Sequence, residues 1–163
     1  MKTDPKPHLD IFLSLFIVSS FVCIDRLTKI FFTHTLSSGE SFVVLRNILH
    51  ITLVHNPGIA FGMFKNHGIV FIIIPVIMIG LLVFNFYHYK YNNEKLSRLY
   101  VVSVSLILAG AIGNLIDRIL YGYVIDFIDV RVFPVFNVAD SAITVGACLL
   151  LWRIYVPSKE SKE

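Results

Sequence analysis

Four long apolar stretches dominate the pattern of hydrophobic and polar positions along the chain. They cover residues 11–32, 68–87, 99–120 and 138–156. A helix needs about 20 apolar residues to cross the hydrocarbon core of a bilayer, and each stretch is about that long. The pattern predicts an all-α integral membrane protein with four transmembrane helices. Residues 1–163 are expected to form a single integral domain.

The segment between the first two stretches has a different pattern. "SFVVLRNILHITLVHN" is rich in β-branched and apolar residues and lies between Gly39 and the turn signal "NPG". Such a run between turn residues favours strands. We therefore expect a small extracytoplasmic β-sheet within residues 39–66.

The first apolar stretch could also be a cleavable lipoprotein signal, because Lys2 and Lys6 precede it and it contains Cys23. Cleavage sites favour a small residue before the cut, whereas Val22 precedes the cysteine, and no soluble domain follows. A retained membrane helix is the expected outcome.

Composition agrees with a membrane protein. Of the 163 residues, 56% are hydrophobic and 15% are charged, and the mean hydropathy is +0.75. Soluble domains average about 45–50% apolar and about 25% charged residues. The basic residues are scattered without a long run, so no nucleic-acid partner is expected. The two cysteines lie in apolar stretches and suggest no disulfide framework.

The distribution of Lys and Arg predicts the orientation, because cytoplasmic loops are enriched in them. Three connecting or terminal segments carry most of these residues: Lys2 and Lys6; Lys90, Lys95 and Arg98; Arg153, Lys159 and Lys162. A multi-pass protein with both termini cytoplasmic follows. Segments 33–67 and 121–137 then lie on the outer side.

With this topology the acidic residues of the helices share one depth. Asp25 and Asp117 lie late in helices that run outward, and Asp140 lies early in a helix that returns. Asp126 and Asp129 lie in the connection at the same level. A charge at the centre of a bilayer costs roughly 2.5–3.5 kcal/mol, so these groups need partners, water or an interfacial position.

Helical spacing separates two groups of polar residues. One stripe contains Gly113, Asn114, Asp117 and Arg118, and the other contains Asn137, Asp140, Ser141 and Thr144. Asp25 with Lys29, an i, i+4 pair, and Asp117 with Arg118 are compatible with structural ion pairs at helix ends. Asp126 and Asp140 have no obvious cation nearby in the sequence.

Two carboxylates without counter-ions at one depth suggest a shared proton. Like charges a few ångströms apart cannot both ionise, so one carboxyl stays protonated while the other acts as a base. Asn137 is a candidate N-cap that places Asp140 in a first helical turn, where the ionised form is favoured, so Asp140 is the expected base. An extended "GYVIDFIDV" would point Asp129 to the opposite side from Asp126.

Other functional classes fit less well. HExxH and GxSxG are absent, and the six histidines are dispersed, so neither a metal nor another cofactor is expected. Ser141 and Lys29 could form a serine–lysine pair. A proton or ion carrier and a non-catalytic scaffold subunit remain alternatives, because intramembrane carboxylates also form proton relays.

The chain resembles the bacterial lipoprotein signal peptidases, the signal peptidase II family, over nearly its whole length. "DRLTK" (25–29) is similar to the family's D-x-x-T-K, "NPGIAFG" (56–62) to N-x-G-A-A-F, "GNLIDR" (113–118) to G-N-x-x-D-R, "VIDFID" (124–129) to V-x-D-F and "FNVADSAITVG" (136–146) to F-N-x-A-D-S. Ile59 departs from the usual alanine, and the interval from Asp126 to Asp140 is short.

The resemblance implies a four-helix aspartic endopeptidase of the bacterial cytoplasmic (inner) membrane. It would remove the signal peptide of prolipoproteins just before a diacylglyceryl-modified cysteine, at an active site toward the outer face. The implied partners are these prolipoproteins and membrane lipid, and we expect a monomer. The implied residues are Asp126 and Asp140 for catalysis; Asn56, Gly58, Asn114, Arg118 and Asn137 for substrate binding; and Asp25, Lys29 and Asp117 for structural support.

Overall fold

The computed structural model describes residues 7–58, 69–91 and 97–155. The described residues form four helices and a three-stranded sheet. The helices are α1 (Pro7–Thr35), α2 (Val70–Tyr91), α3 (Arg98–Tyr121) and α4 (Val138–Tyr155). The strands are β1 (Ser41–Leu45), β2 (Leu49–Asn56) and β3 (Val124–Asp129).

Each helix agrees with one predicted apolar stretch, but the ends differ. The first helix was predicted over residues 11–32, whereas α1 begins at Pro7 and ends at Thr35. The second extends to Tyr91 instead of residue 87. Hydrophobicity marks only the part of a helix that lipid surrounds, so polar turns beyond it are missed. Gly68 and Val156, at two of the predicted ends, lie outside the described residues.

The ends of α3 show how local sequence sets a boundary. Ser97 is the N-cap, and its hydroxyl accepts a hydrogen bond from the backbone N–H of Tyr100 at 3.3 Å. Gly122 is the C-cap and adopts a left-handed conformation with φ of 79°. Glycine adopts this conformation without steric cost. The helix therefore ends at Tyr121, and Gly122 and Tyr123 connect it to β3.

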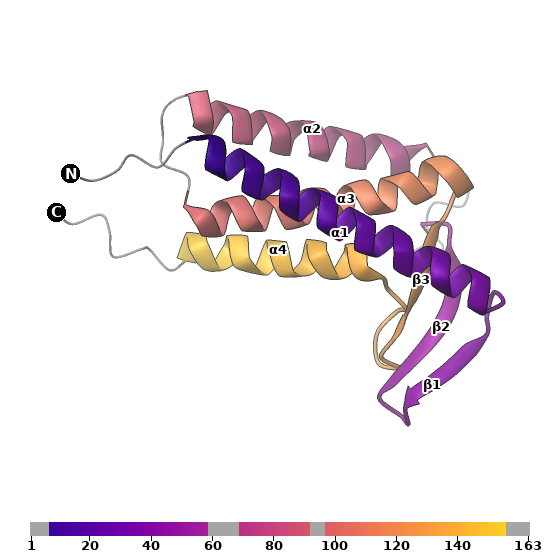
Figure 1. Cartoon of the computed structure of the whole chain (residues 1–163). Coiled ribbons are helices and arrows are strands. Elements are labelled where there is room, and N and C mark those ends of the chain that lie inside the picture. Colours follow the sequence, from indigo (N-terminus) through magenta and orange to yellow (C-terminus); the bar gives the residue numbers. More distant parts are fainter. Residues whose placement is uncertain (1–6, 59–68, 92–96, 156–163) are drawn as a thin grey trace.

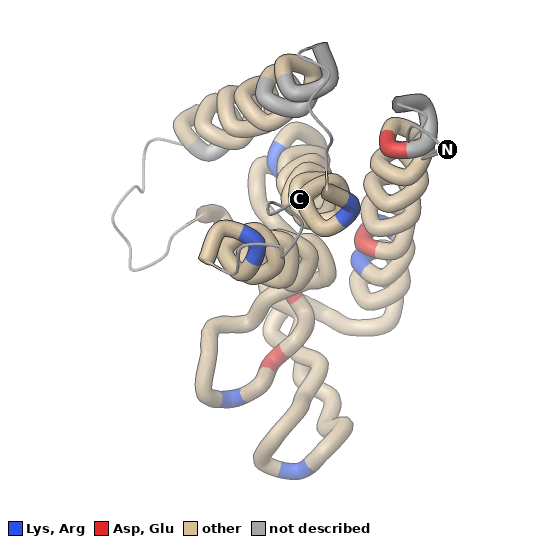
Figure 2. The backbone as a smooth tube through the Cα atoms, turned by 90° about the vertical axis from the view of Figure 1, so that its left-hand side faces the viewer, with Lys and Arg blue, Asp and Glu red and all other residues tan. Residues whose placement is uncertain are grey.

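Three of the described helices, α1, α3 and α4, are long and apolar enough to cross a membrane. In α2 the described apolar part runs from Ile72 to Phe84. α1, α2 and α4 carry many exposed large hydrophobic side chains, including Phe16, Phe84 and Trp152. Few positions along the helices are Lys, Arg, Asp or Glu (Figure 2). This apolar exterior is what a surrounding bilayer requires.

Helix α3 lies at the centre of the bundle, and small residues bring its neighbours close. Val101, Val104 and Ala109 of α3 are at most 1% exposed. At Gly113 an added Cβ would lie only 2.7 Å from Asp25 Oδ2 of α1 and 3.3 Å from Ala139 Cβ of α4. Glycine thus lets three helices approach at one level, as small residues do in membrane helix contacts.

The sheet is antiparallel, with the strand order β1-β2-β3. The predicted region 39–66 supplies β1 and β2, while residues 59–66 lie outside the described part. The third strand comes from the connection between α3 and α4, and Val54 of β2 pairs with Asp126 of β3. The sheet projects from one end of the bundle, and α1 begins and α4 ends at the other (Figure 1).

Candidate active site

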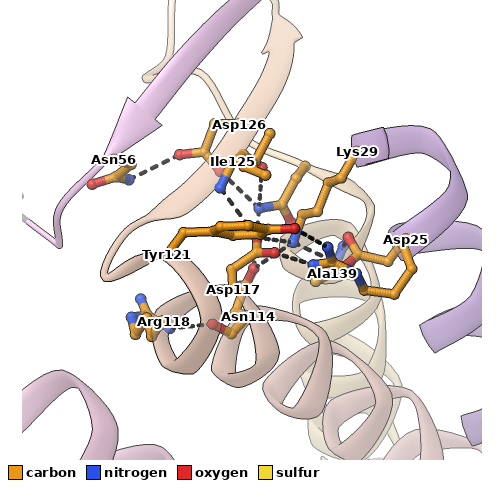
Figure 3. Close-up of polar contacts among 12 residues, drawn as sticks. Asp25, Lys29, Asn56, Asn114, Asp117, Arg118, Tyr121, Ile125, Asp126 and Ala139 are labelled. Atoms are coloured by element: carbon orange, nitrogen blue, oxygen red, sulfur yellow. Dashed lines mark hydrogen bonds and ion pairs between the residues drawn. The ribbon is translucent and has the colours of Figure 1, made fainter. Parts of the chain in front are cut away.

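Polar side chains from α1, α3, β2 and β3 converge on the start of α4, where the bundle meets the sheet (Figure 3). The cluster contains Asp25, Lys29, Asn114, Asp117, Asp126 and Asn137, all 6% exposed or less, together with the partly buried Asp140. Burial of so many polar groups is tolerated only when they bond to one another. The contacts within the cluster separate it into two parts.

The first part is a set of buried ion pairs around Lys29. The Lys29 ammonium lies 2.8 Å from Asp25 Oδ2 and 2.7 Å from Asp117 Oδ2. The predicted i, i+4 pair of Asp25 and Lys29 is therefore formed. Asp25 also accepts a hydrogen bond from the backbone N–H of Ala139 at 3.0 Å, which ties α1 to the start of α4.

The suggested pairing of Asp117 with Arg118 is wrong. Asp117 pairs instead with Lys29 and with Arg26 of α1, and it accepts the backbone N–H of Ile125 at 3.1 Å. Successive side chains on a helix point about 100° apart, so Asp117 and Arg118 face different neighbours. Arg118 donates to the backbone carbonyl of Asn114 at 3.3 Å.

The second part contains Asp126 and Asp140, which the side chain and backbone of Asn137 connect. Asn137 Nδ2 donates to Asp126 Oδ1 at 2.7 Å. The backbone N–H of Asn137 donates to Asp140 Oδ2 at 3.3 Å, and Asn137 Oδ1 accepts the backbone N–H of Asp140 at 2.9 Å. This reciprocal arrangement is an N-terminal capping box, in agreement with the predicted N-cap. It places Asp140 in the first turn of α4.

Asp126 is held by β3 and is 2% exposed. Its other oxygen, Oδ2, accepts Asn56 Nδ2 of β2 at 2.9 Å. Burial is the main cause that raises the pKa of Asp126 to about 6; the negative charge of Asp140 adds to it, while the hydrogen bonds from Asn56 and Asn137 and the charge of Lys29 oppose it. Asp126 therefore retains a proton at a higher pH than an ordinary aspartate.

Asn114 of α3 connects the two parts of the cluster. Its Oδ1 accepts hydrogen bonds from Lys29 Nζ at 3.2 Å and from Asn137 Nδ2 at 3.1 Å. Its Nδ2 donates to Asp140 Oδ1 at 2.7 Å. Arg118 lies one turn further along α3. Its positive charge interacts favourably with both aspartates, more strongly with Asp140 than with Asp126. Both residues thus act on the electrostatics of the aspartate pair.

Asp129 lies outside this cluster, although it is only three residues from Asp126. Asp129 Oδ2 accepts Thr52 Oγ1 at 2.9 Å, and Asp129 Oδ1 accepts the backbone N–H of Arg131 at 2.9 Å. That backbone hydrogen bond is the main cause that holds the pKa of Asp129 below its ordinary value. The expected extended conformation is present as β3, and the two carboxylates bind different neighbours.

Asn56 and Gly58 lie where β2 ends. Asn56 Oδ1 accepts the backbone N–H of Gly58 at 2.9 Å, while its Nδ2 is engaged by Asp126. Gly58 has a φ of 87°, a conformation that favours glycine. Residues 59–62 of the predicted "NPGIAFG" motif, including Ile59, lie outside the described residues.

Sequence reasoning missed Arg26 and the backbone donors of Ile125 and Ala139. Arg26 lies three residues before Lys29 in α1, and this i, i+3 spacing was the available signal for a shared partner. The possible serine–lysine pair gains no support, because Ser141 Oγ donates to the carbonyl of Asn137 at 2.9 Å. Within the described residues no group of three His, Cys, Asp or Glu could hold a metal ion.

Comparison with solved structures identifies the class of protein. A structure described as a bacterial membrane enzyme superposes with a TM-score of 0.81 at 37% sequence identity, covering 94% of each chain. A second structure with the same description gives a TM-score of 0.82 at 36% identity, covering 91% of this chain and 96% of that one. The fold is that of a bacterial membrane enzyme.

Sequence comparison identifies the family. The model for signal peptidase (SPase) II matches residues 17–156. The lipoprotein signal peptidase of Moorella thermoacetica is 41% identical over 139 residues, which cover 85% of this chain and 90% of that protein. The one from Staphylococcus carnosus is 38% identical over 161 residues, covering 96% and 98%. The chain belongs to the signal peptidase II family, and the prediction of a membrane peptidase is confirmed.

Proposed function

We propose that this enzyme cleaves the signal peptide from prolipoproteins immediately before a diacylglyceryl-modified cysteine, with Asp126 and Asp140 as its catalytic pair. The observation that carries the proposal is that Asn137, in a buried polar cluster, donates hydrogen bonds to both carboxylates. Membership of the signal peptidase II family supplies the substrate class.

The reaction uses one carboxylate and one carboxyl group. The carboxylate takes a proton from water as the water oxygen attacks the scissile carbonyl, and the carboxyl group donates its proton to the carbonyl oxygen. The tetrahedral intermediate then collapses. Its carbon–nitrogen bond breaks as the leaving amine of the cysteine receives the proton that the base had taken. One hydroxyl of the intermediate returns its proton to the carboxylate that had donated one, which restores the starting pair. Apolar surroundings strengthen the electrostatic interactions that stabilise the developing charge.

The two aspartates differ in ways that assign these roles. Burial raises the pKa of Asp126 to about 6, which favours it as the holder of the shared proton. Asp140 lies in the first turn of α4, where the helix dipole favours a negative charge. We therefore assign Asp140 as the base.

The cluster's position fits the site of a lipid-modified cysteine, whose acyl chains stay in the bilayer while its carbonyl reaches the headgroup level. We place all four helices across the membrane, with both termini cytoplasmic and the sheet and catalytic pair toward the outer face. The location of the sheet at the end of the bundle opposite the start of α1 and the end of α4 supports this (Figure 1). The proposed enzyme is one monomeric domain in contact with membrane lipid.

Substrate contacts are assigned to the rim of the cluster. Asn56 and Gly58 lie at the end of β2 beside Asp126, and Arg118 lies beside the aspartate pair. Asn137 is fully buried and bonded to Asp126, Asp140 and Asn114, so its role is to hold the pair instead of touching substrate. Asn114 is also buried and is bonded to Lys29 and Asp140, so we assign it the same holding role.

The test uses the purified protein in lipid vesicles with a synthetic prolipopeptide that carries a diacylglyceryl cysteine, and mass spectrometry detects the released signal peptide. Asp126→Asn and Asp140→Asn should each abolish cleavage while remaining folded, because an amide cannot exchange the proton. Asp129→Asn is the matched control and should cleave. A chelator should not change the rate. Chelator-sensitive cleavage that a divalent ion restores, or normal cleavage by Asp126→Asn, would overturn the proposed mechanism.

A further inference from the structure

The inference concerns Lys29 and rests on the proposed function. Lys29 lies outside the aspartate pair, and among the described residues its ammonium contacts Asp25, Asp117 and Asn114. An ammonium group has three N–H donors and no acceptor. Asn114 is different, because its amide has an accepting oxygen at one end and a donating nitrogen at the other.

These properties fix the direction of the Asn114 amide. The end that faces Lys29 must be the oxygen, and Oδ1 lies 3.2 Å from the ammonium. The opposite end, Nδ2, is then directed at Asp140 Oδ1, 2.7 Å away. A reversed amide would bring N–H groups against the Lys29 ammonium and an oxygen against the Asp140 carboxylate. Both contacts would be repulsive.

Lys29 itself cannot easily turn away. Its side chain is completely buried, and Asp25 and Asp117 hold the ammonium at 2.8 and 2.7 Å. Asn137 Nδ2 also donates to Asn114 Oδ1, which reinforces the same amide direction. The orientation is therefore set before substrate arrives, which is the condition for efficient electrostatic catalysis.

We propose that Lys29 is a positioning residue for the reaction, which acts through Asn114 to keep an N–H donor directed at Asp140 and so maintains this carboxylate as the base. A purely structural ion pair would explain the contacts of Lys29 with Asp25 and Asp117. It would not explain why the ammonium also reaches the amide oxygen that faces away from Asp140.

The consequence appears in the pH profile of cleavage. Without the fixed N–H donor, the ionised form of the pair is less favoured, and the acidic limb of the kcat profile moves to higher pH. Among the described residues, Lys29 of α1 and Arg118 of α3 are the charged groups that act on the pair. Lys29 is itself paired with Asp25 and Asp117, and Asp117 is also paired with Arg26. A direct effect of the Lys29 charge on Asp126 would shift the same limb, so the test must separate the two routes.

A double-mutant cycle separates them. Asp25→Asn with Lys29→Met removes one negative and one positive charge together and leaves Asp117 paired with Arg26. In the otherwise native chain this paired substitution should lower kcat about 10²-fold, the usual effect of losing an aligned donor, with little change in KM. In an Asn114→Ala background it should have no further effect on kcat or on the acidic limb.

The outcomes are distinct. A folded paired variant with native kcat and a native acidic limb would show that the ion pair is only structural. An equal effect in both backgrounds would show that Lys29 acts through its charge and not through Asn114. If the paired variant does not fold, Asn114→Ala alone decides, because native kcat there overturns the inference. Failure of the native enzyme to cleave the prolipopeptide would overturn the proposed function itself.

Discussion

Replacement of Asp126 by asparagine should change how the stability of the protein depends on pH. The native carboxyl has a pKa raised to about 6, mainly by burial. The folded state therefore binds this proton more tightly than the unfolded state does. Its contribution to stability is complete at low pH and is lost as the pH rises through about 6. Asparagine does not titrate, so the variant should lack this loss.

The magnitude follows from the size of the pKa change. A rise from the ordinary value of 3.8 to about 6, at 1.36 kcal/mol per pH unit, corresponds to about 3 kcal/mol. Asparagine also loses a hydrogen bond, because its NH2 group faces an N–H donor of Asn56 or Asn137. That cost, of about 1–3 kcal/mol, is independent of pH and cancels when two pH values are compared.

The assay is reversible unfolding in mixed micelles, followed by far-UV circular dichroism between about pH 4 and pH 7, with the free energy of unfolding compared between the native chain and Asp126→Asn. The difference between them should change by about 2.4 kcal/mol in favour of the variant over this pH range, because the unfolded carboxyl, with its ordinary pKa of 3.8, is already partly ionised at pH 4. Asp129→Asn is the control. Because the pKa of Asp129 is lowered, that variant should lose stability relative to the native chain as the pH rises above the acidic range.

Parallel pH dependence of the native chain and Asp126→Asn would refute the reasoning. It would mean that water or a cation compensates the buried carboxylate, so that burial does not raise the pKa of Asp126. The assignment of Asp126 as the proton holder would then fail, even if its replacement still abolished cleavage.

Three further predictions follow from the packing and the topology. Gly113→Ala should reduce the free energy of unfolding by about 1–3 kcal/mol, because its Cβ would meet Asp25 Oδ2 at 2.7 Å. Gly80→Ala in α2 is the control: its Cβ meets no atom within 4 Å, so thermal unfolding should show a neutral or slightly stabilising effect. Asp129→Asn should retain most of the peptidase activity in the prolipopeptide assay. If Asp129→Asn is inactive and Asp126→Asn cleaves normally, Asp129 and not Asp126 is the catalytic aspartate of β3. In a cysteine-free background, a cysteine at Ser38 should react with an impermeant thiol reagent in intact cells and one at Arg98 should not; the reverse pattern would invert the topology.

The sequence predicted the helices and the members of the polar cluster well, because both depend on features that are local. An apolar run of about 20 residues can hardly avoid forming a helix in lipid, since every backbone group must be satisfied internally. The capping box at Asn137 and Asp140 was equally readable, because it needs only residues three apart. The extended conformation of β3 followed from its β-branched residues.

Partner choice across the fold was not readable. Asp117 could pair with its neighbour Arg118 or with a cation on another helix, and only the packing of α1 against α3 selects Arg26 and Lys29. The pairing of β2 with β3 joins segments about 70 residues apart, as the bond between Asn56 and Asp126 illustrates. No periodicity within either segment specifies that register.

The division of the four aspartates of the cluster, Asp25, Asp117, Asp126 and Asp140, explains how one cluster can be both rigid and reactive. Asp25 and Asp117 face Lys29 and Arg26, so two negative charges meet two positive charges in a fixed set of ion pairs. Asp126 and Asp140 instead accept N–H groups from asparagines, which orient a carboxylate without neutralising it. Asn114 touches both halves, so the rigid half can direct a hydrogen bond into the reactive half without adding a salt bridge to it. Replacement of these amides by cations would make the aspartates stronger acids and remove the shared proton on which the proposed hydrolysis depends.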